Sequence, residues 1–297
     1  MGDIASLLII SDAVVSASLI ALILAVGLDA TADDVLYVLR RPKLLFVGVL
    51  SVNVIMPVAA GLVIALYPLT PIVKTGIVLM ALSAVPPILP GEELKAGATK
   101  AYAYGLYTAL ALLTVIVVPA WVAVVGWIYD VQASVPLATV AGKVGWQVLL
   151  PLTIGLALRR LAPKLAAGAT PWVSKFSMTL LFVGEIPVFI NSWPMMMALI
   201  GDGTVLVMVA ISAIGLLAGH ILGGRDLGER GALALASATR HPGIATMIAS
   251  ANAADEQVSA VILLFLLAGM LTAEPYKRLL KRRMRLAPTS PGMPGVT

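Results

Sequence analysis

The sequence predicts an all-α polytopic membrane protein with about nine transmembrane helices. Apolar residues make up 60% of the 297 residues, whereas Asp, Glu, Lys and Arg make up only 12%. Soluble domains carry roughly twice that charged share. The mean hydropathy is +1.01, and the apolar runs are long enough to cross a bilayer, which takes about 20 residues. These features exclude a soluble or nucleic-acid-binding protein, so we expect the lipid bilayer to be a partner and nucleic acid not to be one.

The apolar runs are separated by short stretches that hold most of the charges, and none of these stretches is long enough to fold alone. We therefore expect a single transmembrane domain over residues 1–276. A basic, disordered cytoplasmic tail is expected over residues 277–297, where Pro and Gly follow the charges. The nine apolar segments are Leu7–Leu28, Leu44–Tyr67, Pro71–Ala98, Tyr102–Trp127, Pro136–Leu158, Val173–Pro194, Val205–Leu222, Gly231–Asn252 and Val258–Ala273.

The distribution of basic residues predicts the orientation. With the N-terminus outside, seventeen of the 20 Lys and Arg residues fall on the cytoplasmic side, as the positive-inside rule requires. Lys74 and Lys143 fall on the outer side, and Arg240 lies within a segment. An even number of spans would destroy this segregation. We expect the N-terminus outside, the C-terminus in the cytoplasm, and the protein in the plasma (inner) membrane.

Two segments contain proline followed by glycine where a continuous helix is expected. The third segment contains Pro86, Pro87 and Pro90-Gly91, and the eighth contains Pro242-Gly243. Proline removes a helical hydrogen bond and pushes the residue before it out of helical geometry. The two breaks lie five segments apart, so their segments run in opposite directions. Matched breaks in two inverted halves indicate the binding site of a secondary transporter.

Ionisable residues beside these breaks are functional candidates, because charge is costly within a bilayer. Glu92 and Glu93 stand at the N-terminal end of the second half-helix of the third segment, and Arg240 ends the first half-helix of the eighth. If the breaks meet, either glutamate could form a structural ion pair with Arg240. Alternatively, Arg240 binds an anion or substitutes for a cation, with Thr239, His241, Pro242 and Gly243 beside it.

Two further polar residues lie within apolar segments. Glu185 is near the middle of the sixth segment, where a lone carboxyl is expected to be protonated; it could carry protons or hydrogen-bond a neighbouring helix. Asn53 lies four residues before Pro57, and it could bond a freed carbonyl or line a binding cavity. Candidate coupling residues are therefore Glu185, Glu92 and Glu93.

The sequence lacks the residues that the common enzyme and metal sites need. The chain has no Cys and two His, and it contains no zinc-protease, serine-hydrolase or phosphate-binding motif. We expect no enzymatic activity, no metal site and no cofactor.

Several short motifs resemble the bile acid:sodium symporter family. They are Gly27-Leu28-Asp29-Ala30-Thr31 with Asp34, Arg40-Arg41-Pro42-Lys43, Ile55-Met56-Pro57 and Ala238–Ala245. The similarity extends over about residues 15–276 and matches a divergent, nine-helix member. It implies inverted repeats, a core domain with two crossed, broken helices, and a panel domain made of the first, fifth and sixth segments. The substrate would bind between the two domains.

The sequence departs from this family at the sodium sites. By alignment, Gly91 and Glu92 replace the Ser-Asn of the first break, and Ala236, Arg240 and His241 replace the Glu, Gln and Asn of the second. A guanidinium has no lone pair to ligate Na⁺ and brings its own positive charge. We therefore do not carry the sodium sites over.

The leading hypothesis is a secondary transporter of a small organic anion that works by alternating access and is sodium-independent or proton-coupled. Substrate-binding candidates are Arg240, His241, Pro242, Gly243, Thr239 and Asn53. One alternative is a membrane ligand sensor that keeps the fold but does not transport. Another is an ordinary sodium-coupled symporter.

Overall fold

The computed structural model describes residues 2–286, with side chains from residue 6 onward, and these residues form helices and no strand. Seven helical stretches are long and apolar enough to cross a membrane. This confirms the predicted all-α polytopic fold class, while the count of nine crossings stays a prediction. Five of the seven stretches are single α-helices: α1 (Gly2–Asp29), α7 (Lys100–Tyr129), α10 (Pro163–Ala198), α11 (Thr204–Leu222) and α14 (Gln257–Leu286).

The other two long stretches each contain a π-helical turn just before a proline. The first comprises α3 (Pro42–Val49), η1 (Leu50–Ile55) and α4 (Met56–Leu66), and Pro57 lies at the start of α4. The second comprises α8 (Leu137–Val144), η2 (Gly145–Leu149) and α9 (Leu150–Leu161), with Pro151 at the start of α9. Proline has no N–H to give to the preceding turn, and a wider turn accommodates its ring.

The third and eighth predicted segments are interrupted, as their prolines predict. The third consists of α5 (Pro71–Leu82) and α6 (Leu89–Lys95), and the eighth of α12 (Leu227–Ala238) and α13 (Pro242–Ala251). Neither half is long enough to cross a bilayer at 1.5 Å per residue. These two interrupted segments explain why seven, rather than nine, long helices are present in the described part of the chain.

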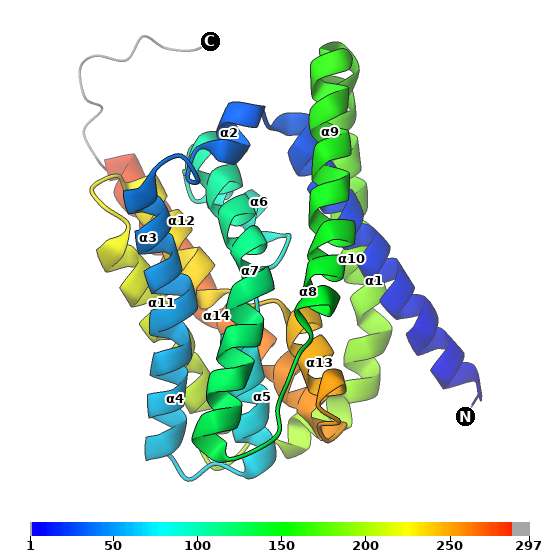
Figure 1. Ribbon diagram of the computed structural model, residues 1–297, viewed down its shortest axis with the longest axis vertical. Coiled ribbons are helices and arrows are strands. Elements are labelled where there is room, and N and C mark those ends of the chain that lie inside the picture. The colour runs from blue at the N-terminus through cyan, green and yellow to red at the C-terminus, as the bar shows by residue number, and fades with distance from the viewer. Residues whose placement is uncertain (1, 287–297) are drawn as a thin grey trace.

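The helices pack in two groups, seen side by side in Figure 1. We call α1, α8–η2–α9 and α10 the panel, because α1, α9 and α10 pack mainly on one another. The remaining long helices and both interrupted segments form the core, in which α11 packs on α12, and α14 on α5 and α11. A short helix, α2 (Ala32–Leu36), leads from α1 into the core and packs on α7.

Large apolar side chains cover the outer surface of both groups, as expected for helices that face lipid. Examples are Leu62 of α4, Trp127 of α7, Phe176 of α10 and Leu206 of α11, each more than half exposed.

Residues 277–286, the first ten of the tail that was expected to be disordered, are helical. Helix α14 continues without interruption through Lys277 to Leu286, and Leu280 within this stretch is 2% exposed. The reason is that Leu280 packs against Gly231 of α12, where a Cβ atom would collide with the leucine side chain. The expectation of disorder from residue 277 is therefore wrong as far as residue 286, and residues 287–297 lie outside the described residues.

Two glycines allow α1 and α9 to touch through their backbones. A Cβ atom on Gly155 would lie 2.6 Å from the carbonyl oxygen of Leu24 and 2.7 Å from the Cα of Gly27. No side chain fits there, so the panel depends on glycine at both positions.

We expect Gly155→Ala to destabilise the protein by about 1–3 kcal/mol, the usual cost of overpacking, measured by thermal unfolding in detergent. Gly142→Ala in α8 is the matched control, because a Cβ there meets nothing within 4 Å. This control is expected to be neutral or stabilising, since alanine favours a helix over glycine. Equal melting temperatures for the two variants would contradict the close contact.

Candidate functional site

The two helix breaks meet inside the core, and we call residues 83–88 together with 239–241 the crossover. The backbone N–H of His241 donates to the carbonyl oxygen of Ala84 at 2.9 Å and to Oγ of Ser83 at 3.1 Å. Segments that lie more than 150 positions apart in the sequence are thereby joined through main-chain groups.

Local chemistry explains the break in the eighth segment. Thr239 and His241 are both extended, with ψ of 131° and 103°. His241 is the N-cap of α13, and its Nδ1 accepts the backbone N–H of Gly243 at 3.1 Å. Pro242 begins the helix, where its missing N–H costs nothing. The crossover therefore presents the positive N-terminal end of α13 together with a histidine ring.

Arg240 is buried in the crossover, 2% exposed, and its guanidinium binds three backbone carbonyl oxygens. Nη1 donates to Ser83 at 3.2 Å, and Nη2 donates to Val52 at 2.6 Å and to Ser237 at 3.2 Å. We call these three oxygens the carbonyl cage. They come from η1, the end of α5 and the last turn of α12, so a single side chain joins three core segments.

Each oxygen of the carbonyl cage lacks its usual helical donor. Pro57 has no N–H to give to Val52 in the π-turn. Ser83 caps the end of α5, where carbonyls are left without intrahelical partners. Ser237 would normally accept from His241, but that N–H is bonded to the first break. The C-terminal ends of α5 and α12 also carry partial negative charge, so the cage attracts a cation.

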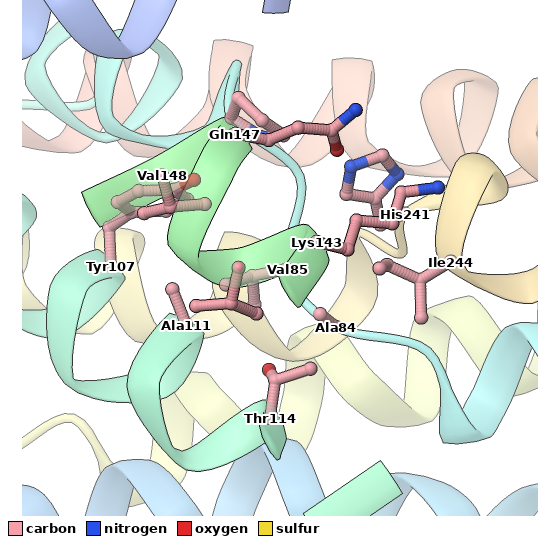
Figure 2. A pocket seen from close by; sticks show the side chains of 12 residues that line it. Ala84, Val85, Tyr107, Ala111, Thr114, Lys143, Gln147, Val148, His241 and Ile244 are labelled. Carbon is pink, nitrogen blue, oxygen red and sulfur yellow. The ribbon is translucent and has the colours of Figure 1, made fainter. Parts of the chain in front are cut away.

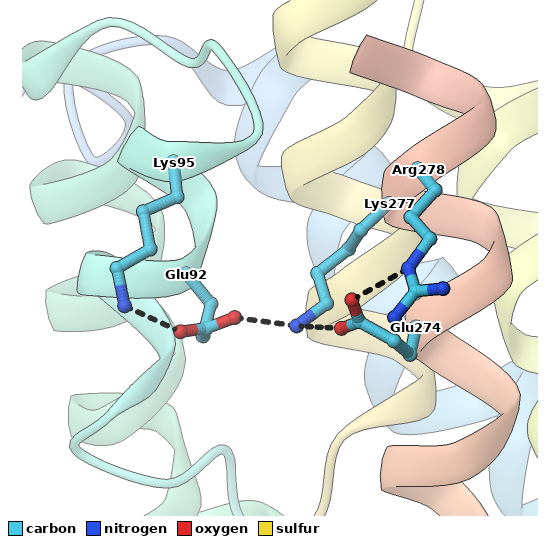
Figure 3. A network of polar contacts seen from close by, with 5 residues as sticks. All are labelled: Glu92, Lys95, Glu274, Lys277 and Arg278. Atoms are coloured by element: carbon cyan, nitrogen blue, oxygen red, sulfur yellow. Dashed lines mark hydrogen bonds and ion pairs between the residues drawn. The ribbon is translucent and has the colours of Figure 1, made fainter. Parts of the chain in front are cut away.

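The expected ion pair between Arg240 and Glu92 or Glu93 does not form. Within the described residues, Arg240 makes no ion pair, and Glu92 instead pairs with Lys95 at 2.9 Å and with Lys277 of α14 at 2.8 Å. Glu274 extends this chain to Arg278 (Figure 3). The two carboxylate oxygens of Glu92 are thus engaged by lysines rather than by the guanidinium.

The side chains of Glu93, Glu185 and Asn53, which the sequence also singled out, make no hydrogen bond to Arg240 within the described residues. Glu93 is fully buried, and neither of its carboxyl oxygens has a hydrogen-bond partner. Glu185 is half-buried on α10 and lines neither of the two cavities described below. Asn53 does not bond a freed carbonyl through its side chain, whose Nδ2 is buried without a partner. Its own main-chain oxygen is the freed carbonyl, and it accepts Nε1 of Trp121 at 2.6 Å.

A cavity of about 450 Å³ lies between the panel and the core. Its walls come from α1, α10, α6 and α7, and its polar residues include Asp29, Glu92, Tyr104 and Ser174. Asp29 is neutralised by Lys100 at 2.7 Å and accepts the Tyr104 hydroxyl at 2.6 Å. Such a space is large enough for a small organic solute.

A second cavity, of about 20 Å³, lies at the crossover itself (Figure 2). Lys143, Gln147, Tyr107 and His241 line it, and the Nζ of Lys143 donates to the carbonyl oxygen of Gly243 at 3.1 Å. From the sequence, Lys143 is expected only on the outer side, and Gln147 is not among the predicted site residues. The position of Lys143, seven residues into an apolar segment, could have identified it, because a charged residue within a membrane span is a functional candidate.

We expect Arg240→Met to lower the free energy of unfolding by about 3 kcal/mol or more, because it leaves three buried carbonyls without a donor. Thermal unfolding in detergent measures this. Arg230→Met is the control, because Arg230 is partly exposed and its Nε donates to one carbonyl, that of Gly224 at 2.6 Å. A similar loss in both variants would contradict a special role for the carbonyl cage.

Comparison with known proteins adds the family. A search of curated proteins finds no match to the chain. The family model described as Sodium Bile acid symporter family matches residues 17–199, which include the first break and end before the second. The family match therefore says nothing about Arg240 and His241, whose roles are argued from the geometry given above. Because the match covers more than half of the sequence, the chain belongs to the sodium bile acid symporter family, whose members are membrane transporters and not enzymes.

Proposed function

We propose that this protein is a sodium-independent secondary transporter that moves a small organic anion by alternating access between its panel and its core. The observation that carries this proposal is the guanidinium of Arg240 in the carbonyl cage. Backbone carbonyls beside broken helices are the groups that coordinate Na⁺ in secondary transporters. Here a covalently attached cation uses them, and its charge repels a second cation.

The anion would meet the crossover from the side of the panel. Thr239, His241, Pro242 and Gly243 lie at the N-terminal end of α13, where the helix dipole favours negative charge. The 450 Å³ cavity extends from the cytoplasmic ends of α1 and α6 to Pro87, a residue that also lines the cavity at the crossover. Pro87 therefore lies between the two cavities, and we propose that the solute reaches the crossover past this residue.

We propose Glu93 as the residue that couples transport to protons. A buried carboxyl without a partner is far less costly when it is neutral, and Glu93 has both oxygens buried and unpartnered. Glu92 is held by two lysines, and Glu185 is only half-buried on α10. Neither offers the same reason to exchange a proton during the cycle.

The proposed orientation has the N-terminus outside and the C-terminus in the cytoplasm, in the plasma (inner) membrane. It is supported by the basic residues, and it places the end of the larger cavity that is lined by Lys95 on the cytoplasmic side.

We expect equal melting temperatures in sodium chloride and choline chloride at the same ionic strength. An ion that binds only the folded protein stabilises it by RT ln(1 + [L]/Kd), about 2.7 kcal/mol at a hundredfold excess over Kd. A sodium-specific rise in the purified protein would overturn sodium independence and restore an ordinary sodium symporter.

We expect Glu93→Gln to abolish the stimulation of uptake by an inward proton gradient, because glutamine cannot release a proton. Uptake is measured in sodium-free proteoliposomes with radiolabelled cholate, acetate and isethionate as probes. Glu185→Gln is the control and is expected to keep the stimulation. If the wild-type protein accumulates none of these probes but is stabilised by one of them, the transporter proposal fails in favour of a ligand sensor.

A further inference from the structure

Lys143 is a cation of the panel that faces the core. It lies in the last turn of α8, and its ammonium group reaches across to the carbonyl oxygen of Gly243 in α13. Within the described residues it makes no ion pair, and Asp12 acts on it only from a distance. Of the residues that line the crossover cavity, Lys143 alone carries a full positive charge.

Two neutral donors lie beside this ammonium group (Figure 2). Gly243 donates its N–H to Nδ1 of His241, so the neutral ring carries its proton on Nε2. Gln147 follows Lys143 by one helical turn, and its side-chain amide lies beside the histidine ring. The panel thus contributes an ammonium and an amide, and the core contributes an imidazole N–H.

Arg240 cannot supply the cation at this place. Its guanidinium is held by the carbonyl cage, and it lines neither cavity. The crossover cavity therefore offers one positive charge, which matches an anion that carries one negative charge.

An anion can replace the carbonyl oxygen of Gly243 as the hydrogen-bond acceptor of Lys143. A carbonyl oxygen is neutral, whereas hydrogen bonds to an oxyanion are about twice as strong. An arriving anion would replace the oxygen of Gly243 at the ammonium group. The bond from panel to core would then pass through the anion.

We propose that Lys143, together with Gln147 and His241, binds the negatively charged headgroup of the transported solute, a monovalent carboxylate or sulfonate. This inference rests on the proposed function and identifies the residues that recognise the charge. The crossover cavity holds only about 20 Å³, the space of roughly one water molecule. The headgroup therefore enters as the panel moves away from the core, while the rest of the solute occupies the larger cavity beyond Pro87.

The chain contains no cysteine, so a single introduced thiol can report the charge at this place. Ala111 of α7 lines the crossover cavity, and Ala111→Cys is a small change. The thiol is treated, in sodium-free proteoliposomes, with a methanethiosulfonate that carries a sulfonate and with one that carries a trimethylammonium group. The sulfonate reagent is itself a small organic monoanion, and both reagents form a mixed disulfide with release of methanesulfinate.

The measured quantity is the rate of the sulfonate reagent divided by the rate of the cationic reagent. We expect this ratio to be at least ten times higher for the introduced thiol than for a free thiol in solution. Adding Lys143→Met is expected to remove this preference, and Lys143→Arg to retain it. Lys74→Met is the matched control, because Lys74 is also on the predicted outer side but lines neither cavity, and it is expected to leave the ratio unchanged.

A ratio that Lys143→Met leaves unchanged would overturn the inference, and so would a thiol that neither reagent reaches. Melting temperatures show whether each variant is folded. If Lys143→Met does not fold, the test uses Lys143→Gln instead, which is also expected to lose the preference for the sulfonate reagent. The sodium comparison described above is independent of this ratio. A sodium-specific rise with an intact preference would reject the proposed function but keep Lys143 as the anion-binding residue.

Discussion

The buried guanidinium of Arg240 is the interaction on which the arrangement of the core depends. Three helical segments end or widen at the same place, and each leaves a carbonyl oxygen without a donor. In the interior of a membrane protein water cannot satisfy these oxygens. One planar side chain with several donors does so at once, which a lysine cannot do in the same geometry. The breaks and the arginine are therefore mutually dependent.

The sequence predicted the breaks correctly and their partners only in part. Proline acts locally, so Pro86–Pro90 and Pro242 indicate where the helices end without knowledge of the fold. The partner of Arg240 was expected among side chains, because carboxylates are visible in a sequence and free backbone carbonyls are not. The π-turn and Pro57 together leave two carbonyls without a helical donor, but only the fold shows that Trp121 bonds that of Asn53 and Arg240 that of Val52. Lys143 was not predicted as a site residue, because it was counted among the basic residues of the outer side although it lies within a helix.

Few polar bonds join the panel to the core, and they lie at different depths. Lys143 bonds Gly243 beside the crossover, and Asp29 bonds Lys100 and Tyr104 near the end of α1. Within the panel, by contrast, α1 and α9 touch through their backbones. The proposed alternating access requires the polar bonds between the groups to break while the contacts within each group persist.

A cation that belongs to the chain cannot leave with the solute. In a sodium symporter the accompanying sodium ions cancel the charge of an anion, whereas the guanidinium in the carbonyl cage is covalently attached to the chain. Under the proposed function, each monovalent anion would cross with its full charge, and the membrane voltage would act on it with about 2.3 kcal/mol per 100 mV. In a cell whose interior is negative, this force is directed outward. An accompanying proton would cancel it, so the electrical character of the cycle depends on whether a proton is bound.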